Sequence, residues 1–137
     1  MYLVDTNVVL EVLLRQANAE EAKRFLGHAP SEQLFLTEFS LYSLGILLTR
    51  RNLHDVFLRT VEDLLFTGRM TLLRLAPADL SDVARCSKQF GLDFDDAYQY
   101  VTADKHNLVI VSFDADFDRT ERGEKDSSSS FANLTGI

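Results

Sequence analysis

The 137-residue sequence lacks the features that would place it in several large classes of protein. A single cysteine, Cys86, excludes an internal disulfide, and its place in a helical pattern after Val83 indicates a small buried thiol. No apolar stretch approaches the roughly 20 residues that a membrane-spanning helix needs. The amino-terminal residues contain neither a basic segment nor a signal-type apolar region, which argues against secretion. We therefore expect a cytoplasmic protein of one domain, long enough to bury a core.

Basic residues are also scarce. The chain has 14 lysines and arginines against 21 aspartates and glutamates, a formal net charge of −7. This balance argues against broad electrostatic affinity for nucleic acid, which depends on basic surface that neutralises phosphates. It does not exclude a nucleic-acid substrate, because bound divalent cations would offset part of the charge of a carboxylate cluster. Five arginines are candidates for local contacts to a phosphate backbone: Arg15, Arg50, Arg51, Arg119 and Arg122.

Predicted strands and helices alternate along the chain. The predicted strands are Tyr2–Val4, Leu34–Thr37, Met70–Leu75 and Leu108–Ser112. The predicted helices are Asn7–Arg15, Ala19–Leu26, Phe39–Arg50, His54–Phe66, Pro77–Phe90 and Asp95–His106. We expect Gly27, Gly68 and Gly91 to end three of these helices. The alternation predicts an α/β fold, with a central parallel sheet of four to five strands and helices on both faces.

The polar carboxyl-terminal residues are expected to lie outside this domain. The domain is predicted to span residues 1–122, and a polar tail follows over residues 123–137, with serine at every position from 127 to 130. Within the tail, Phe131–Leu134 is a candidate for a short additional edge strand.

Acidic residues follow the predicted strands, at the edge where parallel α/β sheets place their sites. Four separate segments send carboxylates towards this edge. They are Asp5 after the first strand, Glu38 after the second, Asp114 and Asp116 after the fourth, and Asp93, Asp95 and Asp96 at the start of the preceding helix. Like charges at 4 Å repel by about 4 kcal/mol per pair at an effective dielectric constant of about 20. The crowding therefore calls for a positive charge between the carboxylates.

A divalent cation is the physical solution to this crowding. Oxygen-only ligands favour Mg²⁺ or Mn²⁺ over zinc. The histidines His28, His54 and His106 are scattered and form no ligand spacing, which also argues against zinc. Hard cations held by a few carboxylates and water bind phosphates, activate a water and stabilise the leaving oxygen of a phosphodiester.

Each acid also has a purely structural interpretation. Asp5 precedes Thr6 and Asn7, so it fits a helix N-cap. One of the acids between positions 93 and 96 would serve as a cap, and Glu38 fits an acid in the first turn of a helix. Asp118 is interpreted as a solvated loop residue. The coincidence of four segments favours a metal site over this series of separate explanations.

Two stretches of the sequence resemble the PIN domain family, as in VapC-type toxins of bacterial toxin–antitoxin systems. In LVDTNVVLEVL, Asp5 with Thr6 and Asn7 matches the family's first aspartate and the Thr-Asn pair after it. In DFDDAYQYVTADKHNLVIVSFDADF, Asp96 before Ala97 matches the family's helix-start aspartate.

The end of the second stretch extends the resemblance to a strand end. The family has a hydroxyl residue, one spacer and an aspartate there, which match Ser112, Phe113 and Asp114. The resemblance covers about residues 1 to 118, with the α/β order of elements between the motifs.

The resemblance implies a Mg²⁺- or Mn²⁺-dependent endoribonuclease that acts on RNA, often held inactive by an antitoxin and commonly homodimeric. Asp5, Asp96 and Asp114 are the expected metal ligands, and Asp116 is expected to be an auxiliary ligand or to orient a metal-bound water. Supporting roles are expected for Thr6, Asn7 and Ser112; the hydroxyl of Thr6 or Ser112 would orient a carboxylate through a hydrogen bond.

One position departs from the family pattern. The family usually carries a glutamate inside the helix after the second strand, about six residues beyond a Ser or Thr, and counting from Thr37 puts Ser43 there. Glu38, five residues earlier, lies about 140° away around an ideal helix. Glu38 is therefore a candidate catalytic residue only if it belongs to the strand end. The alternative is a degenerate PIN domain that acts as a non-catalytic binding module.

Three other classes fit the acidic motif less well. VIVSFDADFD resembles the opening of haloacid dehalogenase-type phosphatases, but too few residues follow Asp118 to complete that fold. An EF-hand loop starting at Asp114 would have Arg119 in place of its glycine and Lys125 in place of its glutamate. A receiver domain would need paired acids after the first strand, where Thr6 follows instead.

Overall fold

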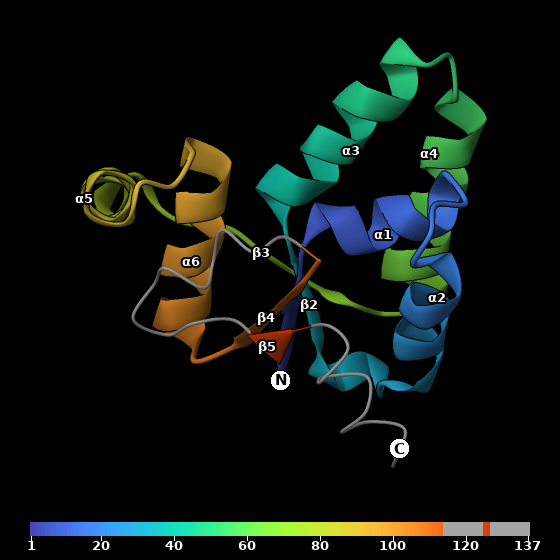
Figure 1. Cartoon of the computed structure of the whole chain (residues 1–137), viewed down its shortest axis with the longest axis horizontal. Coiled ribbons are helices and arrows are strands. Elements are labelled where there is room, and N and C mark those ends of the chain that lie inside the picture. The colour runs from blue at the N-terminus through green and yellow to red at the C-terminus, as the bar shows by residue number, and fades with distance from the viewer. Residues whose placement is uncertain (114–124, 127–137) are drawn as a thin grey trace.

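The computed structural model describes residues 1–113 and 125–126, which form a parallel sheet with helices on both faces (Figure 1). The strands are β1 (Tyr2–Val4), β2 (Leu34–Thr37), β3 (Thr71–Leu73), β4 (Val109–Ser112) and β5 (Lys125–Asp126). Their order in the sheet is β3-β2-β1-β4-β5, and every neighbouring pair is parallel. The predicted α/β fold with a central parallel sheet is confirmed.

The connections between the strands are mainly α-helical, as parallel pairing requires. The α-helices are α1 (Thr6–Leu13), α2 (Ala19–His28), α3 (Glu38–Arg50), α4 (His54–Val61), α5 (Leu80–Phe90) and α6 (Phe94–His106). Shorter segments are the 3₁₀-helices η1 (Ser31–Gln33) and η3 (Pro77–Asp79) and the π-helix η2 (Glu62–Thr67). Among the helices of residues 1–113, none is long and apolar enough to cross a membrane.

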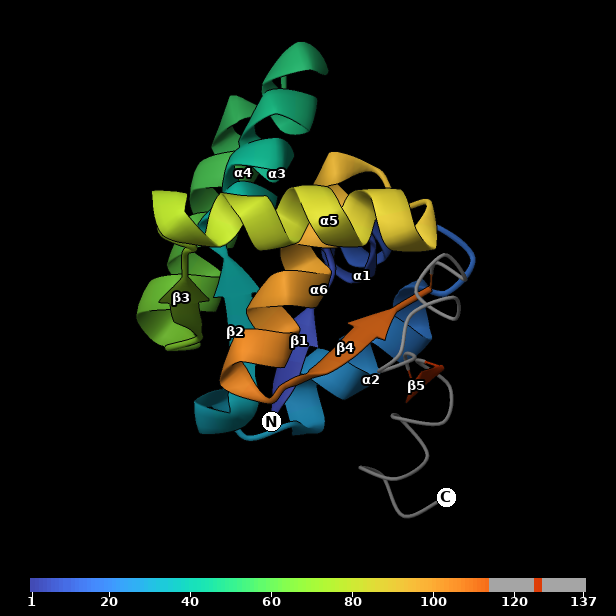
Figure 2. The same cartoon turned by 90° about the vertical axis from the view of Figure 1, so that its left-hand side faces the viewer.

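Side chains of the central strands alternate between the two faces of the sheet. Val4 and Val111 belong to a cluster with residues of α1, α2 and α3, whereas Leu3 and Ile110 pack with Ala103 of α6 on the other face. Figures 1 and 2 show α5 and α6 together on this second side of the sheet. This two-sided burial explains why the strands are short, apolar runs without polar alternation.

One predicted helix end is wrong, and one predicted α-helix changes its geometry along its length. Helix α2 continues through Gly27 to His28, because an added Cβ at Gly27 would meet open space and nothing there requires a break. The helix ends before Pro30, and Ala29 is extended, as expected for a residue that precedes proline. The segment predicted as one α-helix from His54 to Phe66 changes from α to π geometry at Glu62.

Gly68, in contrast, follows the end of that helical segment as predicted. Its amide donates to the carbonyl oxygen of Asp63 at 2.8 Å, and a Cβ at this position would lie 2.6 Å from the same oxygen. Only glycine permits this close approach. Gly91 also ends its helix as predicted, with a left-handed φ of 65° after α5.

The remaining boundaries differ by a few residues. Strand β3 is shorter than the predicted Met70–Leu75, and Pro77 begins the 3₁₀ turn that leads into α5. The candidate edge strand Phe131–Leu134 lies outside the described residues. A different part of the predicted tail, β5, pairs with β4.

Candidate metal centre

The register of β1 and β4 brings Asp5 and Ser112 together across 107 positions of sequence. Val4 pairs with Val111, so the next residue of each strand lies beside the other at the carboxyl end of the sheet. The amide of Asp5 donates to the carbonyl oxygen of Val111 at 3.0 Å and continues the ladder by one residue. Since Val4 and Val111 face α1 and α2, alternation directs Asp5 and Ser112 to the side of α6.

The Asp5 carboxylate is buried and hydrogen-bonded through both of its oxygens. Only 7% of the residue is exposed. Ser112 donates from Oγ to Oδ2 at 2.6 Å, and Gln99 of α6 donates from Nε2 to Oδ1 at 2.7 Å. Asp5 occupies the N-cap position of α1, but its side chain accepts no capping hydrogen bond from that fully described helix. The capping interpretation therefore does not explain why this carboxylate is buried.

Asn7 fixes the end of β4 from the first turn of α1. Its Nδ2 donates to Ser112 Oγ at 3.0 Å, and its Oδ1 accepts from the Phe113 amide at 3.2 Å. Ser112 is thus held between Asp5 and Asn7, with its oxygen acting as both donor and acceptor.

Asp96 lies in the first turn of α6 and is buried, with 9% of the residue exposed. The exposed Asp93 and Asp95 lie beside it, and one carboxylate oxygen from each of the three lies within 4.8 Å of the others. Asp93 occupies the N-cap position, yet its side chain caps none of the α6 amides, all of which the structure describes. Carboxylates at this spacing repel one another, and a cation between them would relieve that repulsion.

Gln99 is a site residue that sequence reasoning missed. It is 4% exposed and lies three residues after Asp96, so both side chains project from the same face of α6. Since an amide oxygen would repel the carboxylate, Nε2 must face Asp5, which directs Oε1 elsewhere. Oε1 is buried without a hydrogen-bond partner among the described residues. An unsatisfied buried acceptor costs about 1–3 kcal/mol.

The signal for Gln99 was present in the sequence. It is a polar residue in a mostly apolar and aromatic stretch of a predicted helix, from Ala97 to Ala103, where a buried amide needs a specific partner. A single polar position does not identify that partner, which comes from the other end of the chain.

Glu38 and Ser43 lie on different parts of α3. Glu38 is half-buried at the first position of the helix, after Thr37, whose Oγ1 accepts the capping bond from the Ser40 amide at 2.9 Å. The β1–β2 register carries Thr37 to the same edge of the sheet as Asp5. Ser43 lines a groove with Ile46, Leu47, Arg50 and Arg51.

The remaining predicted site residues divide into two groups. Thr6 is half-buried at the first position of α1, next to Asp5. Asp114 and Asp116 lie outside the described residues, so their expected roles stay predictions.

The side chains present fit a hard divalent cation. The candidate donor atoms are the carboxylate oxygens of the buried Asp5 and Asp96 and the Gln99 amide oxygen, which has no hydrogen-bond partner among the described residues. A carboxylate has about four lone-pair sites, so Asp5 retains acceptor capacity beyond its bonds to Gln99 and Ser112. An all-oxygen donor set with buried negative charge favours Mg²⁺ or Mn²⁺.

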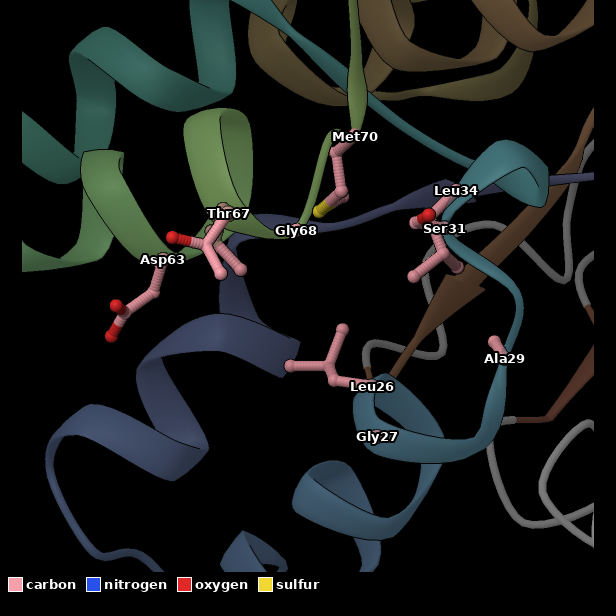
Figure 3. A pocket seen from close by; sticks show the side chains of 10 residues that line it. Leu26, Gly27, Ala29, Ser31, Leu34, Asp63, Thr67, Gly68 and Met70 are labelled. Carbon is pink, nitrogen blue, oxygen red and sulfur yellow. The ribbon is translucent and has the colours of Figure 1, made fainter.

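A separate cavity of about 270 Å³ lies away from these carboxylates (Figure 3). It is bounded by Leu26 near the end of α2, by Leu34 at the start of β2 and by Met70 before β3. These positions are at the amino ends of the strands, opposite the edge that carries Asp5. Figure 3 shows Leu26 and Met70 extending towards the hollow and the Asp63 carboxylate pointing away from it. This cavity contributes no carboxylate to the candidate centre.

Comparisons with solved structures show the same fold at low sequence identity. A toxin–antitoxin complex from Klebsiella pneumoniae contains a chain that is 16% identical, with a TM-score of 0.74, covering 93% of this chain and 98% of that one. PAE2754 from Pyrobaculum aerophilum is 21% identical, with a TM-score of 0.73 and coverage of 99% and 96%. VapC20 from Mycobacterium tuberculosis, described as a toxin that cleaves the sarcin–ricin loop, is 16% identical, with a TM-score of 0.65 and coverage of 100% and 98%.

Comparison with protein families gives a match over most of the sequence. Among curated proteins, no sequence matches this chain. The sequence model of the PIN domain matches residues 2–123, which include every described residue of the candidate centre. The chain therefore belongs to the PIN domain family.

Proposed function

We propose that this chain is a metal-dependent endoribonuclease and the toxin of a toxin–antitoxin pair. The observation that carries the proposal is the buried Asp5 carboxylate, held by Ser112 and Gln99 at the edge of the sheet where Asp96 also lies. A structural carboxylate rarely needs this much burial and support, whereas a metal ligand needs both. The likeness to VapC20, described as a toxin that cleaves the sarcin–ricin loop, supports the activity, and the likeness to the Klebsiella toxin–antitoxin complex supports the toxin role.

In this proposal some residues bind the cation directly and others orient those ligands. Asp5, Asp96 and Asp114 would hold Mg²⁺ or Mn²⁺, with Asp116 as an auxiliary ligand and Glu38 as the candidate fourth acid. When bound, the cation would supply an activated water and charge stabilisation at the leaving oxygen of the RNA phosphodiester. Ser112 orients the Asp5 carboxylate. Asn7 fixes the backbone of Phe113, and with it the start of the segment that carries Asp114.

The partners are part of the proposal. The substrate would be RNA, and the exposed Arg50 and Arg51 at the end of α3 are candidates for phosphate contacts. The apolar side chains of Tyr42 and Ile46, 59% and 54% exposed one turn apart on α3, suit a subunit or antitoxin contact. We expect a homodimer that an antitoxin inhibits in the cytoplasm.

Metal-dependent cleavage of a mixed RNA pool tests the activity. The wild-type protein should cleave in Mn²⁺ or Mg²⁺ and stop when the metal is chelated. Asp5→Asn, purified in the same way, controls for contaminating nuclease. Millimolar Mn²⁺ should also raise the melting temperature, since the cation binds the folded cluster only.

The alternative function is a non-catalytic binding module. The observation that favours it is Ser43, at the place where the family usually carries a glutamate. Mn²⁺ binding without RNA cleavage would support this alternative, and absence of both would reject the metal site itself.

A further inference from the structure

We infer that Gln99 is a positioning residue of the metal centre, which holds Asp5 through Nε2 and offers Oε1 as a neutral oxygen to the cation. The inference rests on the proposed function, which supplies the cation.

The Gln99 side chain is buried. It is 4% exposed in a helical stretch whose neighbours are also buried, so water does not solvate its amide as it would at the surface. A buried amide that served packing alone would be replaced by a hydrophobic residue of similar length at no loss of hydrogen bonding. One of its two polar atoms is already committed, since Nε2 donates to Asp5 Oδ1 at 2.7 Å.

The atom that remains is an acceptor. Oε1 belongs to the same planar amide as Nε2, so it is anchored close to Asp5, and it has no hydrogen-bond partner among the described residues. Because Gln99 Oε1 and the Asp5 carboxylate are both acceptors, neither can satisfy the other, and a positive group that contacts both would. A Mg²⁺ or Mn²⁺ ion satisfies both oxygens, because amide carbonyls and carboxylates are ligands that such cations accept.

Gln99 is also related to Asp96 through the helix that carries both. The two residues are three positions apart on α6, on the same face of the helix. Because Gln99 contacts Asp5, this face of α6 is directed at the end of β1. Asp96, which lies on the same face, is therefore directed towards the same end. A neutral oxygen at this place adds a donor to the site without adding a further negative charge.

The test compares variants by Mn²⁺ binding, measured by electron paramagnetic resonance and calorimetry without RNA. Gln99→Met keeps the length of the side chain and removes both polar atoms. It should weaken Mn²⁺ affinity by about 10- to 100-fold, the range typical for residues that orient metal ligands. Its melting temperature without metal should stay within about 5 °C of wild type.

A matched control comes from the next turn of the same helix. Thr102 is fully buried, and its Oγ1 donates to the Tyr98 carbonyl oxygen at 2.8 Å. Thr102→Val removes a buried polar group from α6 without touching Asp5, so Mn²⁺ affinity should remain that of wild type. Equal affinity loss in Thr102→Val and Gln99→Met would overturn the inference, because helix damage would then explain both.

Gln99→Glu keeps the inference testable if Gln99→Met does not fold. The added carboxylate repels Asp5 without metal and attracts the cation, so the melting temperature should fall in chelator and rise more steeply with Mn²⁺ than in wild type. A smaller Mn²⁺-induced rise than in wild type would contradict the assignment. Wild-type protein that binds Mn²⁺ and cleaves RNA, with Gln99→Met unchanged in affinity, would reject Gln99 alone. Wild-type protein that binds no Mn²⁺ would reject the metal site and Gln99's role together.

Discussion

Ser112 donates a hydrogen bond of 2.6 Å to Asp5, which joins the end of β4 to the end of β1 inside the candidate metal centre. Asp5 is 7% exposed and Ser112 is 1% exposed, so this is a buried contact to a charged acceptor. Such bonds are worth about 1.5–3 kcal/mol. The bond therefore affects both the stability of the sheet edge and the orientation of a proposed ligand.

Ser112→Ala should lower both the stability of the protein and its RNA cleavage. The variant leaves Asp5 Oδ2 without this donor, so we expect a loss of about 1–3 kcal/mol in the free energy of unfolding. RNA cleavage should fall by about tenfold to a hundredfold, because the carboxylate is less well oriented. Denaturant unfolding and RNA cleavage measure the two effects. Ser112→Thr, which keeps the hydroxyl, should retain more of the activity, and equal losses in both variants would assign the effect to packing.

Asp96→Asn should abolish most activity and leave the protein folded. The change keeps the side-chain volume but removes the charge that holds a cation, and each 1.36 kcal/mol of lost transition-state stabilisation is about tenfold in rate. We expect at least about a hundredfold less RNA cleavage. The melting temperature without metal should be unchanged or higher, because repulsion with Asp93 and Asp95 is relieved. Cleavage equal to wild type would remove Asp96 from the catalytic ligands.

Glu38→Gln decides whether the first turn of α3 belongs to the centre. We expect about tenfold weaker Mn²⁺ affinity with little change in melting temperature, since Thr37 still caps the helix. Calorimetric titration with Mn²⁺ measures the effect. If the affinity is unchanged, Glu38 lies outside the site, and Ser43→Glu becomes the variant expected to increase activity.

Arg50→Ala combined with Arg51→Ala should weaken RNA binding and its dependence on salt. Both side chains are exposed at the end of α3, with no ion pair among the described residues. Each RNA phosphate that the protein no longer neutralises lowers the slope of log affinity against log salt by about 0.7 for a single strand. Arg85→Ala is the control, because Arg85 pairs with Asp82 at 2.6 Å on α5. A salt slope that the double variant leaves unchanged would place the RNA elsewhere.

Asp79 should contribute to the stability of the protein at neutral pH and lose that contribution in acid. The hydrogen bond from the Lys105 ammonium, and then that from the Ala76 amide, hold the pKa of Asp79 below its ordinary value of 3.8. A carboxylate whose pKa is lowered by folding stabilises the fold above its unfolded pKa, and this stabilisation disappears as pH falls through the folded pKa. Asp79→Asn should therefore lower the melting temperature at pH 7, and the difference from wild type should shrink below about pH 4.

Lys105→Met tests the cause of that pH dependence. It removes the first donor to Asp79, so the acid dependence should flatten in part, to a smaller extent than in Asp79→Asn, because the Ala76 amide still donates to the carboxylate. The Lys105 side chain is 48% exposed, so salt should weaken the effect in wild type. A pH profile that Lys105→Met leaves unchanged would assign the effect to another group.

The sequence predicted the parts of this protein that depend on neighbouring residues. Strands Tyr2–Val4 and Leu34–Thr37 and the glycine that ends α5 follow from local apolar runs and from backbone freedom. The π geometry of η2 was not predictable. The segment has only six residues, too few for the apolar pattern to distinguish a π-helix from an α-helix. The prediction that Gly27 ends its helix failed because an isolated glycine is tolerated inside a helix where nothing packs on it.

The candidate centre was predictable as a location and not as a set of contacts. The rule that parallel strands gather their carboxyl ends placed Asp5 and Ser112 at one edge. The partner of Gln99 could not be inferred, because it depends on the rotation of α6 about its axis against the sheet. That rotation is set by packing of residues such as Ala103 against Leu3 and Ile110, which no local pattern specifies.

The pairing of the first strand with β4 has a consequence for synthesis. Asp5 is translated well before its partners Gln99 and Ser112, which follow 94 and 107 positions later. The chain cannot assemble the centre until nearly the whole domain has been translated, and closing so long a loop is slow compared with local helix formation. A nascent or prematurely released chain that ends before β4 therefore lacks the assembled centre, and any chemistry that depends on the centre has to wait until translation of the domain is complete.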